Sequence, residues 1–202
     1  MSERPIWVVE TWTVTELLNA GWMQADLDWE RAMADGVAAV GTGDMPAAKE
    51  LTAQCVQLAR THFDADDPRL ATSLANYGTC LKMLGRTEDG ERLLGEARAL
   101  WAGCDRWVDN MTAPRAARSS LFHLRMEQKH RATYEERWRI KWRELVGEAR
   151  DCLGTPASVD ESPAVLAQSA PERWTRERPA MLNDTRKLMA AALLLLRPVT
   201  AA

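Results

Sequence analysis

Apolar residues recur at steps of three and four along most of the chain, which is the spacing of the buried face of a helix. The clearest stripe is formed by Tyr134, Trp138, Trp142, Leu145, Ala149 and Cys152. The pattern predicts helices over residues 14–25, 27–40, 44–62, 68–84, 87–101 and 115–153. The last range is either one long helix or a hairpin of two. β-Branched runs are nearly absent after Val14, so we expect an all-α protein.

Capping residues mark several of the expected helix ends. Thr13 and Glu16 form a capping-box pattern at the start of the first helix, and Asp44 precedes the third. A break is expected at Gly103, after the fifth helix. Ahead of the first helix, residues 5–12 have an extended character and predict a short strand or a packed strap.

The C-terminal part of the chain differs from the rest. Residues 155–180 are rich in Pro, Ser and Ala without a clear period, so we expect a linker or a peripheral strap. Residues 181–197 predict a last helix whose stretch Leu188–Leu196 is apolar around its whole circumference and must be covered. One cover is a second copy of the chain, which would give a homodimer. The other is the chain's own surface, where the helix would compete with a partner and contact Met33, Val37 and Thr79.

Composition and charge fit a globular protein and add one asymmetry. Of the 202 residues, 46% are hydrophobic and 27% are charged, and the net charge is −3, so nothing attracts nucleic acid or membrane globally. Residues 1–113 carry 18 acids and 10 bases, whereas residues 114–143 carry 9 bases and 3 acids. The acidic part can therefore pair with the basic part within one chain, between copies, or with a charged partner.

Residues with catalytic or metal-binding chemistry are sparse. The sequence has no CxxC pattern and no His at ligand spacing from any of the four cysteines, Cys55, Cys80, Cys104 and Cys152. We therefore expect no metal site, no cofactor and no disulfide framework. No catalytic motif is present, so we expect no catalytic residues. An enzyme of unknown class, resting on His123 and His130, is the second alternative. Without a signal peptide or an apolar run long enough for a membrane span, we expect a cytoplasmic protein.

An internal repeat appears when the chain is shifted by 42 residues against itself. Gly36 then aligns with Gly78, and Gly43 aligns with Gly85. Apolar and small residues also coincide on the following helices, as in the pairs Leu51 with Leu93, Cys55 with Ala97 and Leu58 with Leu100. Two helix hairpins of similar build are therefore expected to stack on each other, because one hairpin cannot cover its own apolar face.

The second hairpin, residues 67–102, resembles a tetratricopeptide repeat of the 42-residue kinesin-light-chain-like type. The signature positions of that family are occupied by Leu74, Tyr77, Gly78, Leu81, Gly85, Gly90, Leu94 and Ala97. Residues 27–62 match more weakly, with Thr52 at a position where a large apolar residue is usual, and 115–153 is at best a degenerate basic hairpin. The resemblance implies a short right-handed stack of antiparallel hairpins over residues 1–154, with an N-terminal strap and a C-terminal extension helix.

The resemblance also implies a function, which is binding of a peptide or partner protein in a groove lined by the first helix of each hairpin. Carried over by register, the groove residues are Met33, Val37, Val40, Thr72, Asn76, Thr79, Lys82 and Arg118. Asn76 matches the Asn with which relatives hold a peptide backbone, since an amide donates and accepts at once. Arg118 falls where chaperone-binding relatives grip a terminal carboxylate, but the rest of that clamp is missing. The expected role is that of an assembly or regulatory accessory to an enzyme complex.

Two further features suggest interaction surfaces. Tryptophan frequently anchors interfaces, and four of the nine lie in short or loop-like segments: Trp7, Trp12, Trp22 and Trp107. Residues 125–143 interleave basic with aromatic residues, which gives the first alternative function, RNA or nucleic-acid binding. However, the glutamates of this stretch lie at helical spacing from its arginines, so a self-paired helix is favoured. The spacing concerns Glu127, Glu135, Glu136 and Glu144 against Arg131, Arg139 and Arg143.

Overall fold

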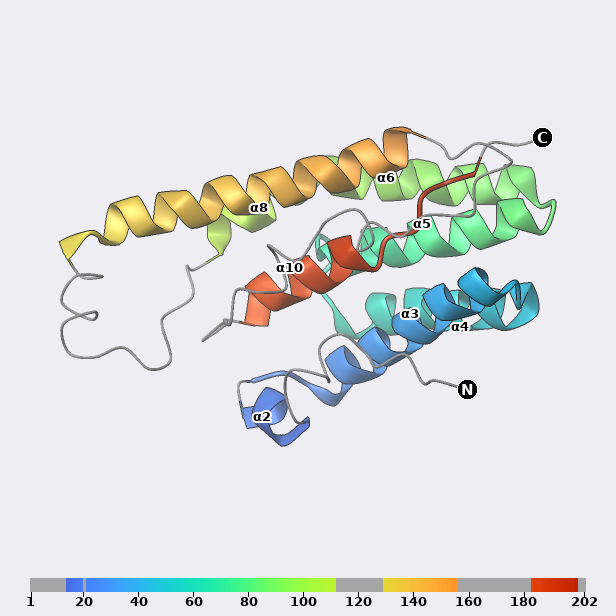
Figure 1. Cartoon of the computed structure of the whole chain (residues 1–202), viewed down its shortest axis with the longest axis horizontal. Coiled ribbons are helices and arrows are strands. Elements are labelled where there is room, and N and C mark those ends of the chain that lie inside the picture. Colours follow the sequence, from blue (N-terminus) through green and yellow to red (C-terminus); the bar gives the residue numbers. More distant parts are fainter. Residues whose placement is uncertain (1–13, 20, 112–128, 156–182, 200–202) are drawn as a thin grey trace.

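The computed structural model describes residues 14–19, 21–111, 129–155 and 183–199. Within these ranges the secondary structure is helical, without a β-strand, so the all-α expectation is confirmed for this part of the chain (Figure 1). The helices are α2 (Val14–Asn19), α3 (Gln24–Thr42), α4 (Met45–His62), α5 (Pro68–Met83), α6 (Thr87–Asn110), α8 (Arg131–Gly154) and α10 (Asn183–Leu193). The expected strap at 5–12 and nearly all of the expected linker lie outside the described residues.

Helices α3 and α4 form one antiparallel pair, and α5 and α6 form a second. Gly43 ends α3 and Gly85 follows α5, and both have a φ of 78°. This left-handed conformation is open to glycine without the steric penalty of a Cβ, so both glycines allow the chain to reverse. At the start of α4 the Asp44 carboxylate accepts a hydrogen bond from the backbone N–H of Ala47 at 3.2 Å, as its capping role predicts.

Glycines also set how closely the helices of each pair approach. A Cβ added to Gly78 would lie 2.8 Å from the carbonyl oxygen of Gly90, and a Cβ added to Gly36 would lie 3.3 Å from Cγ2 of Thr52. The two glycines that the 42-residue shift aligns therefore both face the second helix of their own pair. The approach is tighter in the α5–α6 pair, where backbone rather than a side chain is met.

The first two helices differ in extent from the expected ones. α2 ends at Asn19 instead of residue 25, because the chain turns at Gly21 with a φ of 93° and Trp22 packs with Leu17 and Leu27. α3 then begins at Gln24 and extends two residues beyond the expected end at Val40.

The expected break at Gly103 is wrong, because α6 continues to Asn110. The buried stripe runs on through the glycine, with Ala97, Trp101, Cys104 and Val108 at steps of four, three and four. Those side chains belong to the main core, to which α8 contributes Trp138, Trp142, Leu145 and Ala149. One glycine inside a helix costs about 1 kcal/mol relative to alanine, which burial of this stripe outweighs.

The helices pack in chain order, α3 on α4, α4 on α5, α5 on α6 and α6 on α8. α10 does not continue this order. It returns across α5, and Figure 1 shows it in red between α3 and α8, in contact with α5 and α8. It ends at Leu193 rather than at residue 197. None of the helices in the described ranges combines the length and the hydropathy of a membrane span.

Candidate functional site on helix α5

One face of α5 carries polar side chains that are almost completely buried, and we call it the polar face. Its members lie at helical spacing and are at most 2% exposed: Arg69, Thr72, Ser73, Asn76 and Thr79. Buried polar groups destabilise a fold unless they find hydrogen-bond partners. The partners of this face therefore show what it is built to hold. Several of them come from residues 187–196, which we call the C-terminal segment.

Asn76 binds the backbone of the C-terminal segment with both ends of its amide. Its Nδ2 donates to the carbonyl oxygen of Leu194 at 2.7 Å, and its Oδ1 accepts from the backbone N–H of Leu196 at 2.7 Å. The same Nδ2 lies 2.9 Å from Sδ of Met33 on α3. A carbonyl and an N–H two residues apart are what an extended strand offers along one edge, so Asn76 holds this part of the segment as a neighbouring strand would.

Thr72, which lies one turn before Asn76 on α5, also binds the C-terminal segment. Its Oγ1 donates to the carbonyl oxygen of Ala191 at 2.8 Å. Ala191 lies in the last turn of α10, where backbone carbonyls have no intrahelical partner, so α5 supplies one. Thr79 lies one turn beyond Asn76, and its buried hydroxyl has no hydrogen-bond partner within the described part of the chain.

Apolar contacts cover the rest of the C-terminal segment. Every residue from Leu188 to Leu196 is at most 8% exposed. The Leu196 side chain forms a buried cluster with Val40, Ala48 and Cys80, against which Val37, Ala39, Met45 and Met83 pack. The apolar run is therefore covered by its own chain, and burying it does not require a second copy.

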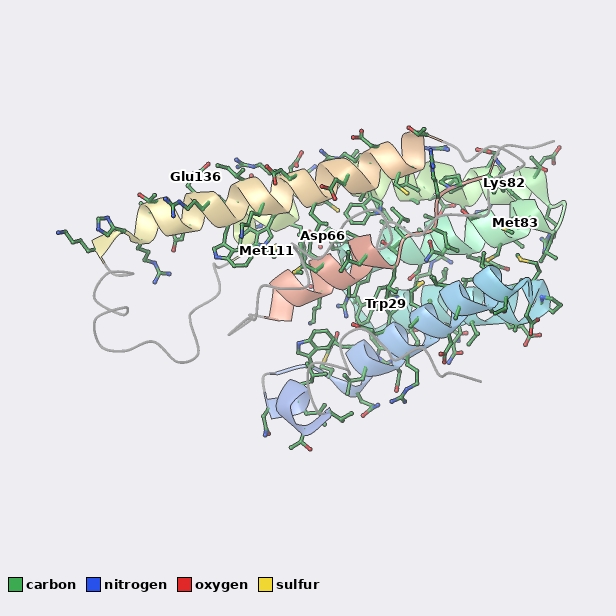
Figure 2. All side chains as sticks on the ribbon, in the orientation of Figure 1. Trp29, Asp66, Lys82, Met83, Met111 and Glu136 are labelled. Carbon is green, nitrogen blue, oxygen red and sulfur yellow. The ribbon has the colours of Figure 1, made fainter. Side chains whose placement is uncertain are left out.

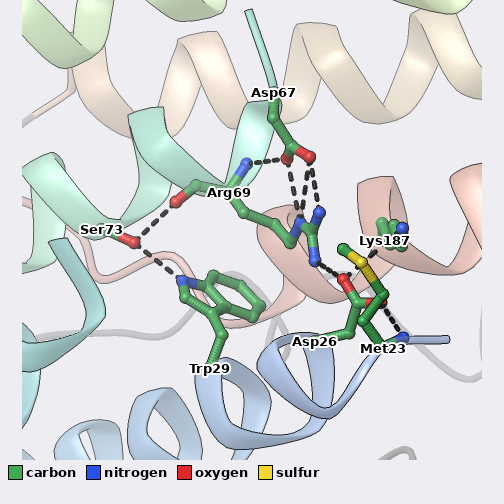
Figure 3. A network of polar contacts seen from close by, with 7 residues as sticks. All are labelled: Met23, Asp26, Trp29, Asp67, Arg69, Ser73 and Lys187. Carbon is green, nitrogen blue, oxygen red and sulfur yellow. Dashed lines mark hydrogen bonds and ion pairs between the residues drawn. The ribbon is translucent and has the colours of Figure 1, made fainter. Parts of the chain in front are cut away.

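A buried group of charges lies near the other end of the segment (Figure 3). The Arg69 guanidinium binds Asp67 through Nε at 3.0 Å and Nη2 at 2.6 Å, and it binds Asp26 of α3 through Nη1. Lys187 of α10 completes the group, with its Nζ 3.5 Å from Oδ1 of Asp26. Two acids thus face two bases, which is how proteins tolerate charges that are out of water. We call these four residues the charge cluster.

Further contacts hold the charge cluster in place. The guanidinium of Arg69 lies 3.3 Å from the ring centroid of Phe63. Burial opposes its charge, but hydrogen bonds and attraction from Asp67 and Asp26 outweigh this and raise the pKa of Arg69, so it stays cationic. The second oxygen of Asp26, Oδ2, accepts from the backbone N–H of Met23 at 2.7 Å. Ser73 joins the polar face to α3, because its Oγ accepts from Nε1 of Trp29 at 2.8 Å.

The predicted groove residues fall into three groups. Met33, Val40, Thr72, Asn76 and Thr79 are buried in the region where the C-terminal segment lies, and Val37 packs beside them. Lys82 faces α6 instead, near the α5–α6 turn in Figure 2, because its ammonium pairs with Glu91 beside Gly90. Arg118 lies outside the described residues.

The structure also places two of the four predicted interface tryptophans. Trp22 is buried in the small cluster with Leu17 and Leu27, and Trp107 is half-buried against the main core. Trp22 therefore offers no exposed ring to a partner in this conformation. Trp7 and Trp12 lie outside the described residues.

Sequence reasoning missed the charge cluster. For the polar face a signal was present, since Arg69, Thr72, Ser73, Asn76 and Thr79 follow the spacing of one helical face in an otherwise apolar helix. Such a stripe is normally read as a solvated face. Its burial depends on residues more than a hundred positions later, which no local pattern indicates.

The cysteine thiols, the potential metal ligands and the basic helix α8 were the other places in the described ranges where a site could lie. Burial raises the pKa of the thiols of Cys55 and Cys104 to about 12, so neither is a reactive thiolate at neutral pH. No group of three His, Cys, Asp or Glu side chains there is arranged to hold a metal ion. On α8, arginines face acids, in the pairs Arg131 with Glu135, Arg139 with Glu136 and Arg143 with Asp109. This self-pairing does not favour the nucleic-acid alternative.

Comparison of the chain with protein-family models, curated proteins and solved structures finds no match. The class of the molecule is therefore defined by its own structure. In the described ranges it is an all-α protein in which two consecutive antiparallel helix pairs carry a buried polar face, and the chain's own C-terminal segment lies against that face.

Proposed function

We propose that this chain is a tetratricopeptide-like protein-binding module, which holds an extended segment of a partner protein against the polar face of α5. The proposed role is that of an assembly or regulatory accessory to an enzyme complex. The observation that carries the proposal is the pair of hydrogen bonds from Asn76 to the carbonyl of Leu194 and the N–H of Leu196. Hydrogen bonds to backbone groups do not depend on the side chains of the bound segment, so Asn76 can bind segments of many sequences, as a peptide-binding surface must.

The helix arrangement supports the tetratricopeptide-like part of the proposal. Gly43 and Gly85 share the same φ, and Gly36 and Gly78 both face the second helix of their pair. In a right-handed stack of such pairs, the first helices line the concave side. Asn76 and Met33 come from the first helices of the two pairs and lie 2.9 Å apart through Nδ2 and Sδ.

A library of random peptides selected on the immobilised full-length chain tests this function. We expect enriched peptides with apolar residues that lose binding when Asn76→Asp replaces the wild type, because the carboxylate cannot donate to a backbone carbonyl. Ser73→Ala serves as a matched control, since Ser73 is on the same helix but binds Trp29 rather than the segment. The proposal is wrong if no selected peptide depends on Asn76.

A further inference from the structure

The C-terminal segment has the attributes of a bound ligand more than those of a further helix of the stack. Its polar attachments to α5 go through its backbone, at Ala191, Leu194 and Leu196, and Lys187 makes an ion pair to α3. A segment from another protein could offer the same groups. Helices α3 to α8 contact one another in chain order, whereas α10 lies outside this order and packs into the main core against α5 and α8.

We infer that residues 187–196 are a ligand bound in cis, and that the partner of this face is a protein segment of the same chemistry. That chemistry is a cation, then a short apolar helix like Leu188–Leu193, then an extended stretch with an apolar side chain in the place of Leu196. This inference rests on the proposed function and names the class of partner. The chain's own segment then acts as a built-in competitor, which a partner must displace.

The need for a cation follows from the charge cluster. Without Lys187, the fixed members are Asp26, Asp67 and Arg69, which carry one net negative charge. Asp26 is fully buried and Arg69 nearly so, so this charge is poorly screened by water. A segment that brings a Lys or Arg to this place is therefore favoured, and one that brings an acid is rejected.

The unpartnered hydroxyl of Thr79 makes the chain's own segment an imperfect ligand. The segment runs in the same direction as α5, since Ala191 binds Thr72 and Leu194 binds Asn76. One turn further along α5 lies Thr79, whose buried Oγ1 has no partner within the described part of the chain. A hydroxyl donates as well as accepts, so a partner that brings a polar group within reach of Thr79 satisfies it and can outcompete the segment.

A binding experiment on the full chain tests the inference. The probe is a labelled peptide of residues 183–202, and the protein is the wild type or the variant Leu196→Glu, which releases the segment but leaves the face unchanged. We expect the variant to bind the peptide at least roughly tenfold more tightly than the wild type. A peptide with Lys187→Glu should not bind, because it brings an acid to Asp26. Adding Asn76→Asp to the protein should weaken binding by roughly tenfold.

The result that overturns the inference is a helical Leu196→Glu protein that shows no saturable binding up to about 100 μM peptide. The segment is then a permanent part of the fold. If Leu196→Glu does not fold, hydrogen exchange of the wild type decides. Backbone amides of 187–196 should exchange at least roughly tenfold faster than those of α5, and equal rates overturn the inference. If library peptides bind through Asn76 while the 183–202 peptide does not, the inference fails and the proposed function stands.

Discussion

The Nδ2 atom of Asn76 donates to the carbonyl oxygen of Leu194 at 2.7 Å, across a sequence separation of 118 residues. The amide oxygen of the same side chain accepts from Leu196, so one residue in the middle of α5 fixes the point where the C-terminal helix gives way to extended chain. This contact joins the part of the chain with the clearest repeat pattern to its most apolar segment.

The two buried threonines of the polar face should respond differently to replacement by valine. Thr72→Val removes the hydrogen bond to Ala191 and leaves a buried carbonyl unpaired, so we expect the free energy of unfolding to fall by about 1–3 kcal/mol. Thr79→Val removes a hydroxyl that has no described partner, so we expect no loss or a small gain. Urea denaturation of both variants measures this. Equal losses would mean that the Thr72 contact does not stabilise the fold.

Replacing Arg69 should be far more damaging than replacing an exposed arginine. Arg69→Met leaves Asp26 and Asp67 buried with Lys187 as the remaining base of the charge cluster, so we expect a loss of about 3–5 kcal/mol. Arg60→Met is the control, because Arg60 pairs with Glu96 at 3.6 Å on the surface and should cost less than about 1 kcal/mol. Thermal or urea unfolding gives both values, and similar losses would contradict the importance of the charge cluster.

Glycine substitutions test the close approach of α5 and α6. In Gly78→Leu the Cβ alone would lie 2.8 Å from the Gly90 carbonyl oxygen, so the helices must separate, at a cost of about 1–3 kcal/mol. Gly95→Ala is the opposite case, since a Cβ at Gly95 meets nothing within 4 Å, and better helix propensity should stabilise by up to about 1 kcal/mol. If the melting temperature of Gly78→Leu is unchanged, the packing of this pair is wrong.

Stability should fall as the pH rises above about 9, in part because of the buried thiols. The pKa of Cys104 is raised by burial from 9.0 to about 12, so the unfolded chain loses this proton at lower pH than the folded chain. Between these values the unfolded state binds fewer protons, and each such thiol lowers stability by about 1.4 kcal/mol per pH unit. We expect Cys104→Ala to show a shallower decline between pH 9 and 11 than the wild type. Parallel curves would place the Cys104 thiol in contact with water.

Features that depend on near neighbours in the chain could be predicted from the sequence. Asp44 caps α4, and Gly85 allows the chain to reverse after α5. Both effects involve backbone groups only a few residues away. The break expected at Gly103 was wrong because it relied on a local signal alone. Burial of the α6 stripe against α8 outweighs that signal and keeps the helix continuous. Of the polar face, Thr72, Asn76 and Thr79 were predicted to share one side of α5, whereas Arg69 and Ser73 were not singled out.

Residue patterns alone predicted that the described ranges are helical, where most helices begin, and that residues 188–196 need a cover. These follow from periodicity and capping, which act over one or two turns. Which cover is used could be seen only in the folded chain, because hydrophobicity does not distinguish the chain's own surface from a second copy. The choice depends on directional contacts over long separations, from Thr72 and Asn76 to the backbone of the segment and from Asp26 to Lys187. Such contacts exist only after α3 and α5 have packed beside each other.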